Sequence, residues 1–349
     1  MQTDTMRRWV LVPRAGGGHE LVLRVVAIPE PGPGQIRVRV HTAAINFRDL
    51  LVRDGRYGSA AAPELVPLSD GAGVVDAIGA GVTSWAAGDR VVSVYFQGWA
   101  DGDPSSGKGL GLGSGTENGM LAEYVILPAD RVTVAPGTLS LTEAATLPCS
   151  GLTAWTALHG NRPYGARTLG PGDTVMVLGT GGVSLFAAQL ALASGAQVWA
   201  TTGDAGKRER LSNLGIAGVV DHTEVEAWGE RVFAATGGAQ IVVNAVGGRS
   251  MDQALAAVAY GGEIAYLGLF DFVSTPPDLL TLMDKAASIR GVAVGSAAAQ
   301  DDLVAAVDRL GVRPVIDQVV DFTDAPDAYE RHLAKGVLGK VVIEMDTAR

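Results

Sequence analysis

The sequence predicts an α/β protein with a β-rich first part and a doubly wound parallel sheet, and two observations carry this prediction. From about residue 144, short apolar strands alternate with helical segments, which is the pattern of a parallel sheet with crossover helices. Before that point, β-branched runs are separated by clusters of glycine and proline, which is typical of strands joined by turns. At 349 residues, the chain has room for two domains with full cores.

The first part is expected to hold several strands and one long loop. The β-branched runs predict strands at 10–12, 21–26, 36–42, 71–78 and 90–95. Residues 98–119 are rich in glycine, serine and aspartate and predict a long loop. A loop of that length in a compact domain is generally functional or mobile.

The second part is expected to hold six parallel strands, near Val175, Val198, Val219, Ile241, Ile264 and Ile289. The tail then predicts a helix at 300–310, a strand at 315–322, a helix at 325–335 and a strand at 340–345. These last strands have no place in a six-stranded sheet, so we expect them to return to the first part. The predicted domains are therefore 1–143 with 297–349, and 144–296.

A glycine loop follows the strand expected at 175–178. The strand leads directly into Gly179-x-Gly181-Gly182, then a helix at 183–194 and a second strand at 197–201. Gly179 allows a tight turn, Gly181 lets a pyrophosphate approach the backbone, and the helix N-terminus favours the phosphates. Position 184 is serine where the third glycine of this pattern normally stands. The context favours a dinucleotide-binding βαβ unit over a glycine-rich turn of another α/β protein.

Composition excludes several classes of function. The net charge of −10 disfavours a nucleic-acid surface, because phosphate binding needs clustered lysine and arginine. The single cysteine, Cys149, excludes an internal disulfide and a cysteine-rich metal site. No apolar run reaches the length of a membrane span, and the one after Arg8 is too short for a signal peptide. We expect a cytoplasmic protein that acts on a small molecule, without nucleic-acid or membrane partners.

Several motifs spread along the chain resemble those of one enzyme superfamily. They lie at 46–49 (Asn-Phe-Arg-Asp), 55–58, 67–75, 77–91, 121–124, 144–148, 152–155, 171–173 and 339–342. The chain resembles the medium-chain dehydrogenase/reductase superfamily, and within it the zinc-independent quinone oxidoreductase-like branch. The resemblance implies a GroES-like catalytic domain closed by the C-terminal tail, with a Rossmann domain inserted, and we expect a homodimer.

The resemblance also locates the positions that carry catalytic zinc ligands in related alcohol dehydrogenases. They fall on Asn46, Ser69, Asp70 and Cys149. One thiol without histidine cannot hold a tetrahedral zinc, so we expect no zinc. The four-cysteine structural lobe is also absent, and 98–119 takes its place. Cys149 is interpreted as a small buried residue in preference to a reactive thiol.

The expected absence of a metal favours one reaction. Without a Lewis acid, a plain ketone is harder to reduce, whereas hydride addition to a conjugated C=C collects charge on a distant oxygen. The first hypothesis is therefore reduction of an enone, quinone or enoyl-type substrate. The enzymatic alternative is a metal-free alcohol dehydrogenase or a biosynthetic tailoring reductase. An alternative of another class is an NADPH-binding protein with a structural or interaction role.

The end of the second strand bears on the choice of cofactor. NAD-specific domains carry an acidic residue there, and this chain has Thr202. By resemblance, Lys207 takes the place of a phosphate-binding lysine, with Arg208 adjacent and Asp204 as an unfavourable negative charge. We expect NADPH in preference to NADH, with a plain solvated helix face as the alternative interpretation of the two basic residues.

The remaining site residues are mostly implied by the resemblance. The catalytic candidates are Tyr57, Asn46 and Ser69, and the substrate-pocket candidates are Asp49, Phe96 and Trp99. The residues expected to bind the cofactor are Thr153, Gly179, Thr180, Gly181, Gly182, Val183, Thr201, Thr202, Lys207, Val246, Leu267, Gly268, Leu269, Gly295, Ser296 and Lys340. For Lys340 an ordinary surface lysine is an equal alternative.

Overall fold

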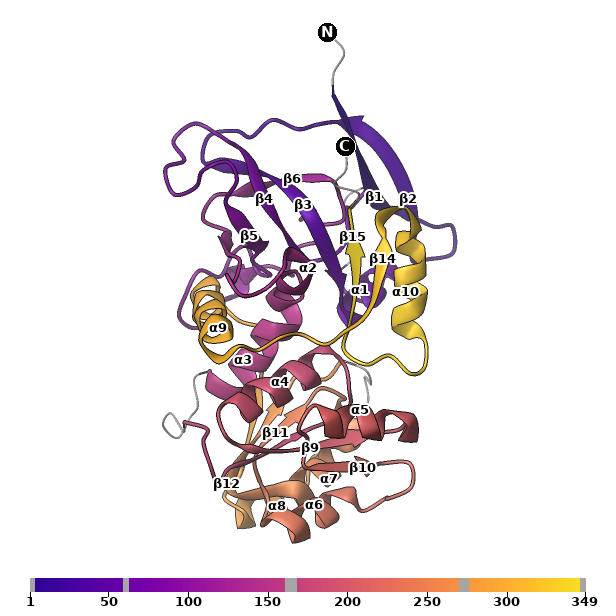
Figure 1. Ribbon diagram of the computed structural model, residues 1–349. Helices are drawn as coiled ribbons and strands as arrows, with labels where there is room; N and C mark the ends of the chain where they lie inside the picture. The colour runs from indigo at the N-terminus through magenta and orange to yellow at the C-terminus, as the bar shows by residue number, and fades with distance from the viewer. Residues whose placement is uncertain (1–3, 59–62, 161–167, 270–275, 346–349) are drawn as a thin grey trace. The chain divides into compact units, whose positions relative to one another are not determined.

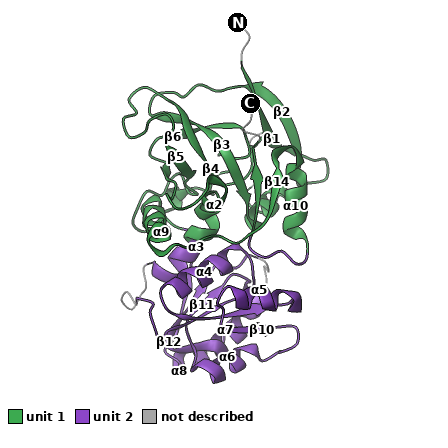
Figure 2. Cartoon of the chain, viewed as in Figure 1, with its two compact units in different colours: residues 1–152, 295–334, 340–349 green, residues 153–294, 335–339 purple. Residues whose placement is uncertain are grey.

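The structure is a computed structural model, and it describes residues 4–58, 63–160, 168–269 and 276–345. The chain forms two compact units, which Figure 2 distinguishes by colour. Unit 1 comprises residues 1–152, 295–334 and 340–349, and unit 2 comprises 153–294 and 335–339. Each unit is described by itself below.

Unit 1 is built on a mostly antiparallel sheet. Its strands are β3 (Gln35–Ile45), β4 (Asp70–Ile78), β5 (Arg90–Ser93), β6 (Tyr124–Pro128), β7 (Val132–Val134), β14 (Ile316–Asp321) and β15 (Lys340–Glu344). Within the described residues these seven strands run in the order β14-β15-β3-β4-β5-β7, with β6 paired to β3. β1 (Thr5–Pro13) and β2 (His19–Ala27) form a separate hairpin. Along β3, Ile36, Val38 and Val40 are buried and alternate with partly exposed arginines, the period of a strand with one covered face.

The C-terminal tail returns to unit 1, as the sequence predicts. β15 pairs antiparallel with β3, placing Val341 opposite Ile45, and β14 pairs parallel with β15. Figure 1 shows α10 (Ala325–Leu333) beside these two strands. The expected helix at 300–310 is present as α9 (Ala297–Leu310). The sequence prediction missed the short strands β6 and β7.

Unit 2 is a parallel sheet covered by helices. Its strands are β8 (Thr174–Val177), β9 (Gln197–Thr202), β10 (Gly218–Asp221), β11 (Ala239–Asn244), β12 (Val258–Tyr266) and β13 (Ser288–Gly291). In the described part of the chain the six strands run in the order β10-β9-β8-β11-β12-β13, all parallel, which confirms the doubly wound sheet. The strand order reverses between β8 and β11, and ligands of such sheets bind at the carboxyl ends of the strands there.

The helices complete the two units. They are α1 (Phe47–Arg53), α2 (Leu141–Ala144), α3 (Leu152–His159), α4 (Gly182–Ala193), α5 (Arg208–Asn213), α6 (Trp228–Thr236), α7 (Met251–Ala257) and α8 (Leu279–Asp284), with short helical turns η1 (Ser106–Lys108), η2 (Leu147–Gly151), η3 (Ala205–Lys207), η4 (Gly248–Ser250) and η5 (Phe322–Asp324). In unit 2, α4 packs on β8 and β9, and α6 and α7 pack on β11 and β12. Residues 98–119 contain only η1 as a helix or strand, as expected for a long loop. None of the described helices is both long and apolar enough to cross a bilayer.

Candidate active site

The glycine loop of unit 2 presents bare backbone to a ligand. Gly179 has a φ of +85°, a left-handed conformation that favours glycine. A Cβ added at Gly181 would meet no protein atom within 4 Å, and no side chain of the described residues caps α4 there. The first N–H groups of α4 are therefore available for an anion, so the loop fits the pyrophosphate of a dinucleotide.

Ser184 stands at the position of the third glycine and bonds α4 to the end of β8. The Ser184 hydroxyl is buried and donates a hydrogen bond of 2.8 Å to the carbonyl oxygen of Leu178, the residue that follows β8. The small side chain thus joins helix and strand at the position where glycine would allow close packing.

The end of β9 carries hydroxyls and no carboxylate. Thr201 Oγ1 accepts a hydrogen bond of 2.9 Å from the N–H of Gly179, which fixes the turn. Thr202 Oγ1 accepts a 3.1 Å bond from the N–H of Asp204 and donates to its carbonyl oxygen. The Asp204 carboxylate caps η3 by accepting a 2.9 Å bond from the N–H of Gly206. The carboxylate expected to disfavour a 2′-phosphate is therefore bonded to the backbone of its own turn.

The two adjacent basic residues at the end of η3 and the start of α5 differ in their partners. Lys207 Nζ donates to Thr180 Oγ1 at 3.1 Å and to the Val337 carbonyl oxygen at 2.7 Å, so it ties the glycine loop to residues 335–339. Arg208 instead pairs with Glu224 at 2.7 Å and with Asp221 at 3.5 Å. Lys207 beside the loop fits a cofactor phosphate, whereas Arg208 is engaged with acids.

The loops after β11 and β12 approach each other closely. Asn244 Oδ1 accepts hydrogen bonds from the N–H groups of Val246, at 3.1 Å, and Gly247, at 3.0 Å. A Cβ at Gly268 would lie 2.3 Å from the Gly247 nitrogen, so only glycine permits this approach. The neighbouring Leu269 is 39% exposed.

Other residues expected at the cofactor have identifiable local roles. Thr153 is buried in the first turn of α3. Gly295 and Ser296 belong to unit 1, where the Ser296 hydroxyl caps α9 by accepting a 3.1 Å bond from the N–H of Ala299. Their contact with a cofactor stays a prediction.

In unit 1, Asn46 stands between β3 and α1. Its backbone N–H donates a 2.8 Å hydrogen bond to Asp49 Oδ2, the reciprocal bond of a helix capping box. Asp49 is 1% exposed and also accepts a 3.0 Å bond from Arg48. Asp49 was expected in the substrate pocket, but in the structure it is a buried residue that caps α1.

Arg48 is a buried residue that the sequence analysis missed. Its guanidinium lies 5.2 Å from the ring centre of Tyr57 and 5.3 Å from that of Tyr95. Arg48 Nη1 also donates a 2.6 Å hydrogen bond to the Leu112 carbonyl oxygen, which anchors the loop at 98–119. The Tyr57 hydroxyl lies 3.5 Å from the Leu110 carbonyl oxygen, so Arg48 and Tyr57 reach the same loop.

The two aromatic candidates for the substrate pocket, Phe96 and Trp99, differ in exposure. Phe96 is 3% exposed and packs edge-on against Tyr95, with ring centres 4.5 Å apart. Trp99 is partly exposed, and its ring centre lies 6.0 Å from that of Phe96. Phe96 therefore belongs to the core of unit 1, and Trp99 lies nearer its surface.

A buried polar cluster occupies the positions at which the resemblance places metal ligands. Ser69 Oγ donates a 2.7 Å hydrogen bond to Asp70 Oδ1, and the N–H of Cys149 donates a 3.2 Å bond to Asp70 Oδ2. Cys149 lies in η2, a π-helical turn, and turns of this kind often occur at functional sites. Lys340 Nζ lies 3.9 Å from Asp70 Oδ2. Lys340 is 2% exposed, which rules out an ordinary surface lysine.

Burial controls the electrostatics of this cluster. It raises the pKa of Asp70 to about 6, against the nearby positive charge of Lys340. Burial, reinforced by the charge of Asp70, raises the pKa of the Cys149 thiol far above its ordinary value. Cys149 is therefore a protonated thiol at neutral pH and not an activated thiolate.

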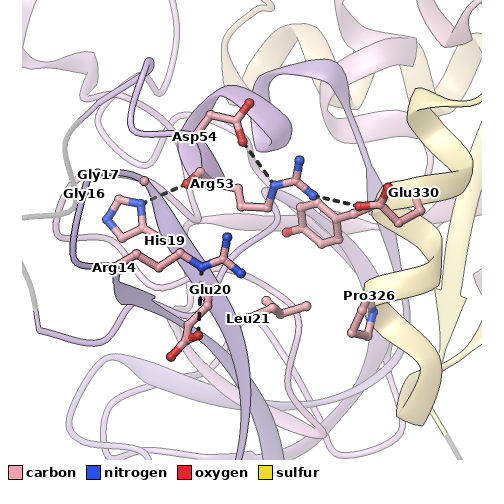
Figure 3. Close-up of a pocket in the computed structure, with 12 residues that line it drawn as sticks. Arg14, Gly16, Gly17, His19, Glu20, Leu21, Arg53, Asp54, Pro326 and Glu330 are labelled. Atoms are coloured by element: carbon pink, nitrogen blue, oxygen red, sulfur yellow. Dashed lines mark hydrogen bonds and ion pairs between the residues drawn. The ribbon is translucent and has the colours of Figure 1, made fainter.

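A separate hollow lies on unit 1, around the C-terminal end of α1 and α10 (Figure 3). It has a volume of about 710 Å³. Its arginines have acidic neighbours: Arg53 lies 3.2 Å from Asp54 and 3.4 Å from Glu330, and Arg14 lies 3.9 Å from Glu20. None of the described residues that line it was a predicted site residue.

Comparisons with known proteins agree with both units. Residues 32–137 match the sequence model of the alcohol dehydrogenase GroES-like domain, and residues 182–335 match that of the zinc-binding dehydrogenases. A zinc-type alcohol dehydrogenase-like protein of Schizosaccharomyces pombe is 34% identical over 97% of this chain and 99% of its own length. The chain belongs to the medium-chain dehydrogenase/reductase superfamily.

Other members of the superfamily extend the comparison. A structure from Sinorhizobium meliloti 1021, assigned as an alcohol dehydrogenase, is 41% identical and superposes with a TM-score of 0.89, covering 99% of this chain and all of that one. An NAD-dependent alcohol dehydrogenase is 32% identical, with a TM-score of 0.84 and coverage of 97% and 99%. A mycocerosic acid synthase-like polyketide synthase of Mycobacterium tuberculosis is 33% identical over 82% of this chain but only 13% of its own length. The chain is thus an NAD(P)-dependent oxidoreductase of this superfamily, related to zinc-type alcohol dehydrogenases.

The buried cluster does not fit the zinc of these relatives. A catalytic zinc needs about three protein ligands from histidine, cysteine or carboxylates. The described residues contain no group of three or more such side chains placed to hold a metal. At the expected ligand positions stand an amide, Asn46, and a hydroxyl, Ser69, while the Lys340 ammonium already supplies positive charge beside Asp70.

Proposed function

We propose that the protein is a zinc-independent, NADPH-dependent oxidoreductase that interconverts a carbonyl compound and an alcohol. The observation that supports this most directly is the buried Lys340 ammonium beside Asn46 and Asp70, two of the family's metal-ligand positions, in a chain that keeps an open dinucleotide loop. The alcohol dehydrogenase relatives favour this activity over the conjugate reduction expected from the sequence.

Each unit has one task in this proposal. The N–H groups around Gly181 would hold the pyrophosphate, and Lys207 with Thr202 would accept the 2′-phosphate of NADPH. Bound NADPH supplies a hydride. The polar groups of unit 1 would stabilise the oxygen of the substrate as it gains negative charge, the task that zinc has in the related enzymes.

Conjugate reduction remains the second candidate, in the form of a biosynthetic tailoring reductase or a quinone oxidoreductase-like enzyme. The similarity to a segment of a polyketide synthase supports it, because that relative is a biosynthetic enzyme. The physical argument from the metal also supports it, since charge on an enolate oxygen can be stabilised by hydrogen-bond donors alone.

The test is NADPH oxidation across matched pairs of saturated aldehydes or ketones and their α,β-unsaturated counterparts, with the products identified by mass spectrometry. We expect the saturated carbonyl compounds to yield alcohols. Saturated ketones formed from enones would favour the second candidate instead. If the protein binds NADPH but turns over none of these compounds or quinones, it has a binding role.

Zinc independence has its own measurement. We expect elemental analysis of the purified protein to find far less than one zinc per chain, and activity to survive a strong chelator. One firmly bound zinc per chain, with activity lost to the chelator, would overturn this part of the proposal. Sedimentation of the same sample tests the expected homodimer.

A further inference from the structure

Lys340 is a cation built into the interior of unit 1. As the first residue of β15, it is 2% exposed. Its Nζ donates hydrogen bonds of 2.6 Å to the Ile45 carbonyl oxygen and 2.5 Å to Asn46 Oδ1. Lysine is almost never fully buried unless it is paired, and Asp70 lies 3.9 Å away. The ammonium is therefore fixed at the junction of β3 and α1.

The ammonium fixes the orientation of the Asn46 amide. Lysine has only donors, so the amide atom that faces Nζ must be the oxygen. Asn46 Oδ1 also accepts a 2.9 Å bond from the Ser150 hydroxyl. Both contacts hold the oxygen, and the NH₂ group is turned away from them.

The NH₂ group of Asn46 is left with a donor to use. Nδ2 is buried and makes no hydrogen bond within 3.5 Å to the described residues, and the acceptor that it faces is the Asp70 carboxylate, whose pKa the Asn46 amide lowers. The NH₂ group has two N–H bonds, so at least one of them has no acceptor there. An unsatisfied buried donor costs about 1–3 kcal/mol, and such groups are rare in native structures without a specific reason. An acceptor oxygen on a ligand would satisfy it.

We propose that Asn46 Nδ2 is the donor that binds the reacting oxygen of the substrate, and that Lys340 is the positioning residue that aims it. This inference rests on the proposed function. In the reduction, the carbonyl carbon accepts a hydride from NADPH, which becomes NADP⁺. The π electron pair of the C=O bond moves to the oxygen, and the resulting alkoxide takes a proton from water. Asn46 keeps its own protons and stabilises the negative oxygen, with the Lys340 charge behind the amide.

The first test observes the amide directly and needs no turnover. The chain has five asparagines, so selective ¹⁵N-asparagine labelling gives five side-chain amide signals, and the variant Asn46→Asp identifies the one from Asn46. Cyclohexanone, a saturated ketone, is titrated into the labelled protein without bound cofactor. We expect the Asn46 NH₂ signal alone to shift, and this shift to vanish in Lys340→Met. No shift of the wild-type signal at high millimolar ketone overturns the donor assignment, whatever the physiological substrate is.

The second test uses kinetics with the best carbonyl substrate from the panel. Lys340→Met should lower kcat by about 10²–10³-fold, the range for losing an oxyanion donor, with a smaller effect on KM and with NADPH affinity little changed. Lys340→Arg, which keeps a donor cation, should retain part of the rate. Ser150→Ala is a milder variant for the case in which Lys340→Met does not fold, and it should also lower kcat selectively.

Lys285→Met is the matched control. Lys285 is 9% exposed, and its Nζ donates to three carbonyl oxygens of unit 2, those of Leu255, Ala256 and Val258. It tests what the loss of a purely structural buried lysine does, and we expect a loss of thermal stability without a selective fall in kcat. Equal kinetic effects of Lys285→Met and Lys340→Met would overturn the positioning role. Absence of turnover in the wild type, with the amide shift present, would refute the proposed function and leave the donor assignment standing.

Discussion

The glycine loop of unit 2 and the Asn46 cluster of unit 1 depart from their family patterns to different extents. In the loop, one glycine of three is replaced, and the Ser184 hydroxyl bonds to the Leu178 carbonyl oxygen without closing the approach to Gly181. In the cluster, two of the four metal-ligand positions carry an amide and a hydroxyl, and a buried ammonium lies beside Asp70 at a third. The loop is altered in one detail, whereas the chemistry of the cluster is replaced.

The difference follows from whether backbone atoms or side-chain atoms bind the ligand. Phosphate binding at a helix N-terminus uses backbone N–H groups, so it depends on the turn and tolerates changes in side chains. Polarising a carbonyl oxygen uses side-chain atoms or a metal, so it can be rebuilt with other side chains on the same scaffold. The predictions below test whether the loop is intact and how the cluster is maintained.

The largest effect is expected at the bare backbone of the loop. Gly181→Val should weaken NADPH and NADH binding by about 100-fold or more, because the side chain fills the space that a pyrophosphate needs. Thermal stability should change little, because Gly181 has a φ of −80° and an added Cβ meets no protein atom within 4 Å. Gly170→Val, before the opposite end of β8 and equally unobstructed, is the control for fluorescence titrations. Wild-type affinity in Gly181→Val would mean that the dinucleotide does not bind at this loop.

The choice of cofactor should depend on Lys207. Lys207→Ala should weaken NADPH binding by about 1–3 kcal/mol more than NADH binding, because a charge-assisted contact with the 2′-phosphate is lost. The measurement is the ratio of the two dissociation constants, since the lysine also holds Thr180 and would affect both cofactors through the loop. Arg208→Ala, whose guanidinium pairs with Glu224, should leave the ratio unchanged. A wild-type preference for NADH would contradict the assignment.

The free energy of unfolding should depend on pH through His332, which is buried in unit 1 near the charge of Lys340. Burial, and then the charge of Lys340, lowers the pKa of His332 to about 4 from the ordinary 6.5. The folded state therefore keeps this imidazole neutral while the unfolded chain binds a proton. Its contribution to stability is full above pH 6.5 and is lost as the pH falls towards 4, by about 2 kcal/mol at pH 5.

His332→Gln tests this linkage. Urea unfolding of the variant between pH 7 and pH 5 should show a free energy of unfolding that falls less than in the wild type. Identical pH dependence in the two proteins would show that His332 is not buried beside the charge of Lys340.

The sequence predicted the features that depend on local pattern. The six strands of unit 2 were predicted because each is a short apolar run between helical segments, and the return of the tail followed because its strands had no place there. β7 was missed because three residues leave little periodic signal, and β6 because it follows the long loop and ends at Pro128, a residue typical of turns. The cap formed by Asp49 could have been found, since Asn-x-x-Asp before an apolar run resembles a capping box.

The placement of Lys340 could not have been predicted in the same way. It meets Asn46 across 294 positions of sequence, through the pairing of β15 with β3. No local pattern says whether the first residue of a strand points inward, and lysine is generally exposed. The burial of Arg48 between Tyr57 and Tyr95 depends in the same way on the fold around the loop at 98–119.

The smallest expected effect concerns the one altered position of the glycine loop. Ser184→Ala removes the 2.8 Å hydrogen bond to the Leu178 carbonyl oxygen and should lower the free energy of unfolding by about 1 kcal/mol, with cofactor affinity within about twofold of wild type. Ser194→Ala is the control, because that hydroxyl makes a 2.9 Å bond to the Leu190 carbonyl oxygen at the other end of α4 and is only partly buried. Its effect on unfolding should be smaller, since water can replace the lost partner. A large loss of NADPH affinity in Ser184→Ala alone would show that the hydroxyl takes part in binding the dinucleotide, and the loop would then be rebuilt chemically as the cluster is.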